Sequence, residues 1–272
     1  MNSPEDWIRI VAQRRRDPVD CPEVEMLLGA SPRGGSRAFF ARGNDGKRWW
    51  IKTLNNRQHS RVVVTEHIVA MVGQLIGAPT CTVSIINIPE AFKAKVVGDL
   101  GIEPGFAHAS LAVRDAEEIR GQDCLYFISK DDNRRRFTGL YALYDWCWGD
   151  DPQFLVCRSE DCTMYSHDHG WYLGPGGRWD ERVLMRNIKM SHQWNSWVSR
   201  HLAEAIDPAE ARRLVGCLRG IDGPRLTEVI TVIPKSWAVT DQELGTLGYF
   251  LAERARDVAT RLARLGGGSL IQ

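Results

Sequence analysis

The stretch Phe137–Tyr172 holds the acidic groups whose types and spacing could do chemistry. An acidic turn, Gly149–Gln153, follows a run with helical spacing and contains Asp150 and Asp151. Two short apolar runs come next, and the second delivers Asp168 at its end. In phosphoryl transfer one acidic loop handles the acceptor hydroxyl, and a second carboxylate holds Mg²⁺. The stretch therefore predicts a helix, a loop and a hairpin that bring both acidic groups to one edge of a phosphoryl-transfer site.

A lysine and a glutamate upstream could complete such a site. Residues 60–76 have helical periodicity, and Glu66 falls on a face with otherwise apolar or small residues. A buried carboxylate needs a partner, and Lys52, on the preceding predicted strand Arg48–Thr53, is the natural candidate. In kinases a strand lysine paired with a helix glutamate positions the nucleotide phosphates. A surface lysine and a separate surface glutamate remain the alternative.

A small-residue loop from 29 to 36 precedes these elements. It lies between a predicted strand, Val24–Leu28, and an extended run, and the tight turn Asn44–Gly46 then leads into the strand of Lys52. A sheet of this kind could cover phosphates with its first loop, although most such loops are only turns. The loop residues that we expect to contact the cofactor are Ser31, Gly34, Gly35 and Ser36.

The order of the elements predicts an α+β protein with two lobes and a cleft between them. The first half is rich in strands and has one main helix, whereas the second half is helical around the acidic hairpin. We expect an N-terminal lobe over 1–130 and a C-terminal lobe over 131–272. Asp115–Arg120 predicts one or two helical turns, and Leu125–Ser129 a strand. A capping box at Thr240–Glu243 predicts the start of a long last helix, and one face of another helix is predicted from Trp194, Trp197, Val198 and His201.

The composition excludes several classes of protein. The 272 residues carry a net charge of +1, so no overall field points to nucleic acid or a membrane as a partner. The seven cysteines are scattered, which favours a reducing, cytoplasmic location over a disulfide scaffold. The chain shows neither a signal peptide nor an apolar run of the roughly 20 residues that span a bilayer.

At four places the chain resembles the HipA-like kinases, specifically their compact single-domain members. The resemblance extends from about residue 24 to residue 265, and its motifs support one another through their order and spacing. They are Trp50-Ile51-Lys52 with Thr65-Glu66-His67, then Gln74-Leu75-Ile76-Gly77-Ala78-Pro79, then Phe137-Thr138-Gly139 through Asp145-Trp146 to Asp168-His169-Gly170, and last Ile233-Pro234-Lys235-Ser236-Trp237 with Arg254.

The resemblance implies a protein-kinase-like fold, with an antiparallel-sheet N-lobe and a mostly helical C-lobe. It also implies transfer of the γ-phosphate of ATP, with Mg²⁺, to a hydroxyl acceptor, a protein Ser or Thr in the best-known members. By this likeness Lys52 contacts the phosphates and Glu66 holds Lys52. Asp150 or Asp151 orients the attacking hydroxyl. The metal ligands are then Gln153 and Asp168.

Two departures from the kinase pattern leave a second class of function open. Kinases place an Asn a few residues after the catalytic Asp, whereas this chain offers Gln153. The loop 31–36 is not a GxGxxG sequence. A degenerate, pseudokinase-like nucleotide-binding or scaffold protein is therefore the alternative to an active phosphotransferase. A third interpretation, a zinc site, involves Cys157, Cys162, His167 and His169, although their spacing fits no common zinc pattern.

Overall fold

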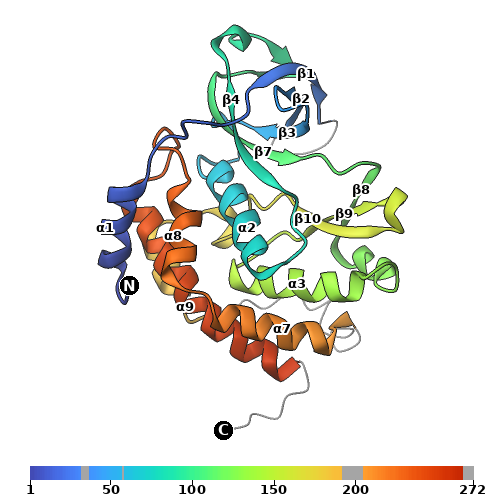
Figure 1. Cartoon of the computed structure of the whole chain (residues 1–272), viewed down its shortest axis with the longest axis vertical. Coiled ribbons are helices and arrows are strands. Elements are labelled where there is room, and N and C mark those ends of the chain that lie inside the picture. The colour runs from blue at the N-terminus through green and yellow to red at the C-terminus, as the bar shows by residue number, and fades with distance from the viewer. Residues whose placement is uncertain (32–36, 57, 192–204, 266–272) are drawn as a thin grey trace.

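The computed structural model describes residues 1–31, 37–56, 58–191 and 205–265. A β-sheet forms the upper part of the molecule in Figure 1, and helices form the lower part. The helix α2 (Val62–Ile76) and a smaller sheet lie between the two. The predicted α+β class, with an antiparallel-sheet N-terminal part and a helical C-terminal part, is confirmed.

Five antiparallel strands form the upper sheet, in the order β1-β2-β3-β7-β4. Alternate residues of these strands face a small apolar core; Trp49 and Ile51 of β3 point into it, whereas Trp50 and Lys52 point to the opposite face. The tight turn at Gly46, with φ of 76°, joins β2 to β3 as the sequence predicts. The strand bounds are Val24–Ala30 for β1, Phe39–Gly43 for β2, Arg48–Lys52 for β3, Val83–Ile88 for β4 and Gly105–Leu111 for β7.

The helix α2 is buried on nearly every side, which explains its apolar sequence. It contacts β4 and β7 above it and the helices α3, α7 and α8 below it. Gly77 ends the helix in the left-handed conformation, and its N–H caps the last turn. Because both flanks are covered, Glu66 and His67 are buried along with the apolar residues of the helix. The predicted helix over 60–76 is confirmed, and it carries Glu66 into the interior.

A second sheet, of three antiparallel strands, lies beside α3 (Asn133–Trp146). Its strands are β8 (Ala116–Arg120), β9 (Gln153–Cys157) and β10 (Thr163–His167), in the order β10-β9-β8. The hairpin of β9 and β10 agrees with the sequence, but the helical turns predicted over Asp115–Arg120 are wrong. Local propensity favoured a helix there, and pairing with β9 holds the segment extended.

The strand predicted over Leu125–Ser129 is also wrong, because a 3₁₀ helix, η2 (Gly121–Phe127), occupies most of it. The remaining short elements lie in the connections of both parts of the chain. They are η1 (Glu90–Phe92), β5 (Val96–Val97), β6 (Leu100–Gly101), η3 (Arg158–Glu160) and η4 (Pro175–Gly177).

The long last helix, α9 (Asp241–Leu265), organises the helical part. Thr240 and Glu243 form the predicted capping box at its start, with a Glu243 N–H to Thr240 Oγ1 distance of 3.1 Å. The N-terminal helix α1 packs on α9, so residues 4–14 lie against the helical part although they precede the sheet in sequence. The division at residues 130 and 131 stays a prediction. The other helices here are α1 (Pro4–Arg14), α4 (Glu181–Asn187), α7 (Pro208–Arg219) and α8 (Gly223–Thr231).

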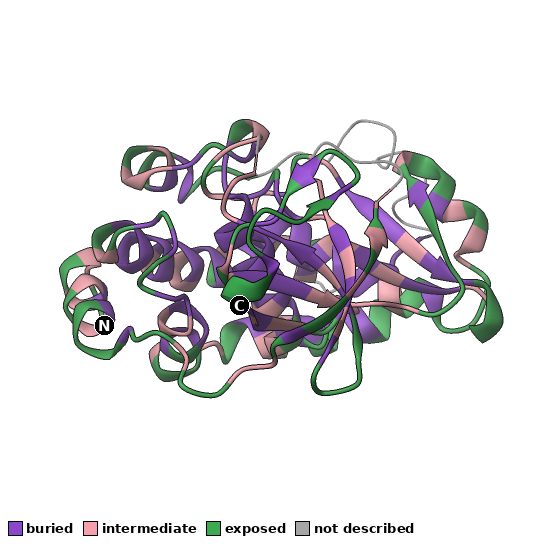
Figure 2. Ribbon diagram, turned by 90° about the horizontal axis from the view of Figure 1, so that it is seen from above, coloured by how far each residue is buried: buried purple, intermediate pink, exposed green. Residues whose placement is uncertain are grey.

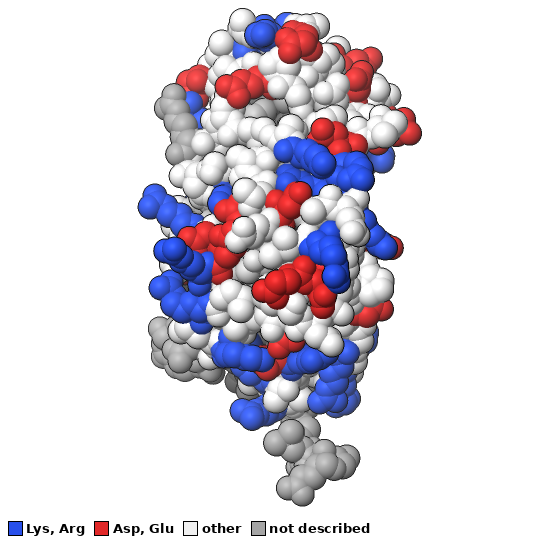
Figure 3. Space-filling model, turned by 90° about the vertical axis from the view of Figure 1, so that its left-hand side faces the viewer, with Lys and Arg blue, Asp and Glu red and all other residues white. Residues whose placement is uncertain are grey.

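Burial follows this arrangement. Seen from above in Figure 2, the buried residues run through the inner faces of the strands and helices, and the exposed residues form the rim. On the face drawn in Figure 3, Lys and Arg side chains are interspersed with Asp and Glu. The helix predicted around Trp194 and Trp197 lies outside the described residues. No described helix is both long and apolar enough to cross a bilayer.

Candidate active site

Lys52, Glu66 and Asp168 meet at the junction of the two sheets. Lys52 Nζ donates a hydrogen bond to Glu66 Oε1 and another, of 2.6 Å, to Asp168 Oδ1. The three residues come from β3, from α2 and from the residue after β10, which are far apart in the sequence. The structure thus brings together one ammonium and two carboxylates that the sequence analysis singled out.

The charges of this triad depend on its burial. Burial alone would lower the pKa of Lys52, but the charges of Asp168 and Glu66 outweigh it and raise that pKa above its usual value. Burial raises the pKa of Glu66 to about 7 in spite of the Lys52 charge. Burial also acts to raise the pKa of Asp168, but the charge of Lys52 outweighs it and lowers that pKa below its usual value. Lys52 and Asp168 are therefore firmly charged, whereas Glu66 takes up a proton most readily.

The backbone around Asp168 fixes its direction. Asp168 has φ of 54°, which turns the chain sharply at the end of β10. The next N–H, of His169, donates to Glu66 Oε2 at 2.9 Å. The His169 ring is buried and bonds through Nε2 to Ser166 Oγ at 2.8 Å. Both carboxylates are thus held by the same turn, since Glu66 binds its backbone and Asp168 is its first residue.

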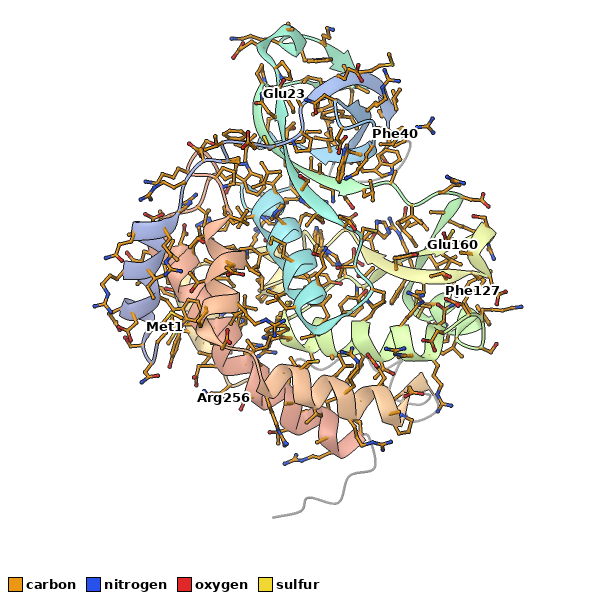
Figure 4. The ribbon with its side chains drawn as sticks, in the orientation of Figure 1. Met1, Glu23, Phe40, Phe127, Glu160 and Arg256 are labelled. Carbon is orange, nitrogen blue, oxygen red and sulfur yellow. The ribbon has the colours of Figure 1, made fainter. Side chains whose placement is uncertain are left out.

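A cavity of about 500 Å³ opens beside the triad. The upper sheet contributes Trp50 and Lys52 to its wall, and the lower sheet contributes Leu155, His167 and the Asp168 turn. The Trp50 ring stacks on Phe40 with centroids 4.7 Å apart, and Figure 4 labels Phe40 in the upper sheet. The cavity is therefore lined by an aromatic ring, Trp50, by an aliphatic side chain, Leu155, and by the charged triad.

In the acidic turn Gly149–Gln153, the two aspartates have different hydrogen-bond partners. Asp150 Oδ2 accepts from the Gly176 N–H at 2.9 Å, so this side chain holds a neighbouring loop. Asp151 Oδ2 accepts from Gln153 Nε2 at 2.7 Å. Gln153 is buried, and its Oε1 has no hydrogen-bond partner among the described residues. That oxygen is free to accept from, or coordinate, a group that binds here.

The predicted loop residues are placed only in part. Ser31, at the end of β1, lines the cavity, as the cofactor prediction requires. Gly34, Gly35 and Ser36 lie outside the described residues. Their contact with a cofactor therefore stays a prediction.

Three residues at the cavity carry no role in the sequence prediction. His108 of β7 is directly opposite Lys52 in the sheet register, and its Nδ1 lies 3.3 Å from His67 Nδ1. Glu118 and Arg120 of β8 line the cavity mouth. The alternation of β7 could have pointed to His108. Glu118 and Arg120 were missed because the sequence predicted helical turns over 115–120.

The residues considered for zinc do not converge. His167 lines the cavity, whereas His169 turns to Ser166 and Cys157 Sγ contacts the Arg114 carbonyl oxygen at 3.2 Å. Within the described ranges, no three His, Cys, Asp or Glu side chains are grouped so that they could hold a metal ion. The zinc interpretation has no support.

Arg254 fixes the chain that leads into the acidic turn. Its side chain is fully buried in α9. The guanidinium donates to the carbonyl oxygens of Trp146 (2.9 Å), Asn187 (3.0 Å) and Met190 (2.6 Å), and to that of Asp145. Burial lowers the pKa of Arg254 to about 10, which leaves it charged at neutral pH. One side chain thus ties the end of α3 to the end of α4.

We expect Arg254→Met to lower the free energy of unfolding by about 3–5 kcal/mol, because it strands buried carbonyl oxygens that the guanidinium satisfies. Urea denaturation measures the loss. Arg256→Met is the matched control on the same helix, since the Arg256 side chain is 79% exposed, and it should change stability by less than about 0.5 kcal/mol. Equal effects of the two substitutions would show that the Arg254 contacts contribute nothing.

Comparison with known proteins agrees with this geometry. The family model described as "HipA-like kinase" matches residues 24–138. The Helicobacter pylori proinflammatory kinase CtkA superposes with a TM-score of 0.56 at 12% identity, over 92% of this chain and 98% of that chain. No curated protein sequence matches the chain.

Two further solved structures give weaker superpositions. The Golgi casein kinase with Mn/ADP bound has a TM-score of 0.46 at 7% identity, over 97% of this chain and 77% of that chain. Shewanella oneidensis HipA, in a complex with HipB and operator DNA, has a TM-score of 0.43 at 11% identity, over 98% of this chain and 74% of that chain. The family match over residues 24–138 and the fold shared with CtkA confirm the resemblance seen in the sequence.

Proposed function

We propose that the protein is an ATP- and Mg²⁺-dependent phosphotransferase that transfers the γ-phosphate to a hydroxyl acceptor. The observation that carries the proposal is the contact of Lys52 with both Glu66 and Asp168 at the wall of a 500 Å³ cavity. Kinases use a strand lysine, a helix glutamate and a metal-binding aspartate for this reaction. The acceptor follows from the resemblance alone, which favours the hydroxyl of a protein serine or threonine.

The cavity suggests how a nucleotide would lie. The base would fit between Trp50 of the upper sheet and Leu155 of the lower sheet, since both side chains line the cavity and offer it an aromatic and an aliphatic surface. The phosphates then extend toward Lys52, whose ammonium is the buried cation of the site. Ser31 lines the same cavity.

Asp168 and Gln153 are the residues that would hold Mg²⁺. The ion prefers hard oxygen ligands and commonly takes one or two from the protein and the rest from phosphates and water. Gln153 offers a buried amide oxygen with no partner, and Asp168 offers a carboxylate that stays ionised beside Lys52. When bound, the ion would neutralise charge on the phosphates.

Asp151 is the better candidate to orient the acceptor. Asp150 is held by the loop at Gly176, whereas Asp151 is joined to Gln153 beside the proposed metal ligands. The acceptor oxygen would form a bond to the γ-phosphorus while the bond from that phosphorus to the bridging oxygen breaks. ADP leaves with the electron pair, and the hydroxyl proton passes to Asp151.

Lys52→Ala should weaken ATP use far more than Lys47→Ala. Lys52 would lose its phosphate contact and leave two buried carboxylates without their cation. Lys47 lies on the same hairpin with its side chain 58% exposed, so it is a matched control. We expect kcat/KM for ATP to fall roughly a hundredfold or more in the first variant and by less than about twofold in the second. Equal effects would show that the Lys52 triad has no part in nucleotide use.

Incubation of the protein with γ-labelled ATP and a cell lysate tests the proposed reaction and names the acceptor. Mg²⁺-dependent label on a protein serine or threonine supports the proposal. The alternative, a pseudokinase-like scaffold, is favoured by one observation: Gln153 already occupies an Asp151 carboxylate oxygen. Binding of Mg²⁺ and ATP without transfer to the chain itself or to any lysate species would support that alternative instead.

A further inference from the structure

Three side chains form a row across the lower sheet at the end that faces the triad. In the register of this sheet Arg120 of β8 is opposite Gln153 of β9, and Gln153 is opposite His167 of β10. Residues directly opposite on antiparallel strands share a face and lie about 5 Å apart at their Cβ atoms. Asp151, just before β9, and Asp168, just after β10, both lie beyond the same end of these antiparallel strands. The row therefore adjoins both carboxylates of the proposed reaction.

Two polar atoms of this row have no partner. Gln153 Oε1 and His167 Nε2 are both buried and make no hydrogen bond to any described residue. A buried polar atom without a partner is costly, so native proteins satisfy nearly all of them. Arg120 and His167, on either side of Gln153, both line the cavity. The row has the character of a polar subsite that a ligand completes.

Arg120 supplies the second positive charge of the cavity. Among the described residues that line it, Lys52 and Arg120 are the two with a permanent cation. Lys52 is buried against two carboxylates, whereas the Arg120 side chain is 62% exposed and bonds to Glu118 Oε1 at 2.7 Å. The hydrogen bond and charge of Glu118 raise the pKa of Arg120, and the charges of Asp151 and Asp168 add to them. The guanidinium thus lies within the field of both aspartates.

The hold of Glu118 on Arg120 is weak enough to exchange. Exposed ion pairs contribute little, and a phosphate offers an arginine two oxygens in bidentate geometry with more charge than one carboxylate. The acidic turn Gly149–Gln153 contains no cation. Transfer of a phosphoryl group needs positive charge where negative charge develops. Lys52 of β3 is already paired with two carboxylates, so the additional charge has to come from another element, and β8 carries Arg120.

We propose that Arg120 binds the terminal phosphate of the nucleoside triphosphate, and that Glu118 holds its guanidinium at the cavity mouth until the phosphate arrives. His167 Nε2 is the polar atom beside that phosphate, and Gln153 Oε1, which can only accept or coordinate, would face the Mg²⁺ ion that accompanies the phosphates. This assignment rests on the proposed function and adds to it a residue that distinguishes a triphosphate from a diphosphate. Lys52 binds the phosphates nearer the nucleoside, and Arg120 binds the terminal phosphate, which only a triphosphate has.

The test compares two nucleotides in three variants by isothermal titration calorimetry with Mg²⁺. The probes are ADP and a non-hydrolysable ATP analogue, and the variants are Arg120→Ala, Arg120→Lys and Arg158→Ala. Loss of a charge-assisted hydrogen bond should weaken binding of the triphosphate roughly ten- to a hundredfold in Arg120→Ala and leave ADP within about twofold. Arg120→Lys should lie in between, because an ammonium keeps the charge without the bidentate geometry.

Arg158→Ala is the matched control. Arg158 also forms an exposed ion pair with a β8 glutamate, Glu117, but neither residue lines the cavity. It should bind both nucleotides as the wild type does. Because Arg120 is exposed, Arg120→Ala should keep the thermal midpoint of the wild type, which separates a loss of binding from a loss of fold.

Glu118→Gln tests the ion pair between Glu118 and Arg120 by removing the charge of Glu118. Release of the guanidinium should leave triphosphate binding equal to that of the wild type or a few-fold tighter, and a tenfold loss would overturn the role given to Glu118. Arg120 has no such role if Arg120→Ala weakens both nucleotides alike or neither. Wild-type protein that binds neither nucleotide would refute the proposed function itself, and the assignment of Arg120 with it.

Discussion

Asp168→Asn should reduce Mg²⁺-dependent ATP turnover by roughly a hundred- to a thousandfold while the protein stays folded. Asparagine keeps the size of the side chain and an oxygen that can accept from Lys52, but it removes the charge that would bind the metal. Removal of one preorganised electrostatic group typically has an effect of this size on kcat. Steady-state release of ADP measures the turnover, and circular dichroism verifies the fold.

Asp161→Asn is the control for this substitution. Asp161 lies in the connection between β9 and β10 with its side chain 68% exposed, and asparagine tolerates its φ of 48°. Its turnover should match that of the wild type. Undiminished turnover in Asp168→Asn would refute the metal role of Asp168, and an equal loss in both variants would show a general effect of lost negative charge.

Stability should fall steeply in mild acid because four histidines are uncharged in the folded protein. Burial lowers the pKa of His67 and that of His167 to about 4 and that of His169 to about 3, and it lowers that of His108 as well. In the unfolded chain histidine takes up its proton near pH 6.5. Between that pH and the folded pKa the unfolded state binds more protons, so the free energy of unfolding decreases as the pH falls. Each histidine contributes about 1.4 kcal/mol per pH unit in this window.

Glu66 acts in the opposite sense over part of the same range. Its pKa in the folded state is raised to about 7, so below that pH the folded state binds a proton that the unfolded state lacks. The stabilisation is about 1.4 kcal/mol per pH unit down to the ordinary glutamate pKa. Four histidines outweigh one glutamate, which leaves a net loss of about 4 kcal/mol per pH unit between pH 6 and pH 5.

Urea denaturation at pH 7, 6 and 5 measures this slope. His108→Asn removes one of the titrating groups, and the slope should then decrease by about 1.4 kcal/mol per pH unit. The comparison of slopes remains informative even if the variant is less stable at every pH. A free energy of unfolding that stays constant from pH 7 to pH 5 would contradict the burial of these histidines.

The triad could be predicted because each of its members lies in an element with a clear local signal. The alternation in β3 separates Trp50 and Lys52 from the core-facing Trp49 and Ile51. The periodicity of α2 leaves Glu66 with a buried face and a need for a partner. In both elements the hydrophobic pattern determines which side is buried, and the chemistry of the polar residue then follows.

The cavity mouth could not be predicted because long-range pairing decides its structure. Ala116, Glu117 and Glu118 have high helix propensity, and only pairing with β9 makes the segment a strand. The choice between Asp150 and Asp151 likewise depends on contacts with Gly176 and Gln153 that no local pattern encodes. Arg254 stands out in the family resemblance, but its four carbonyl partners are known only from the packing of α9 on α3 and α4.

The central claim is that Lys52, Glu66 and Asp168 surround the phosphates of ATP and its Mg²⁺ ion. Calorimetric titration of the wild-type protein with ATP, in Mg²⁺ and in EDTA, tests it most directly. We expect one nucleotide per chain to bind in Mg²⁺ and the affinity to fall at least roughly tenfold in EDTA, because the ion offsets the charge between the phosphates and Asp168. Absence of binding, or binding that is equally tight without Mg²⁺, would contradict the account.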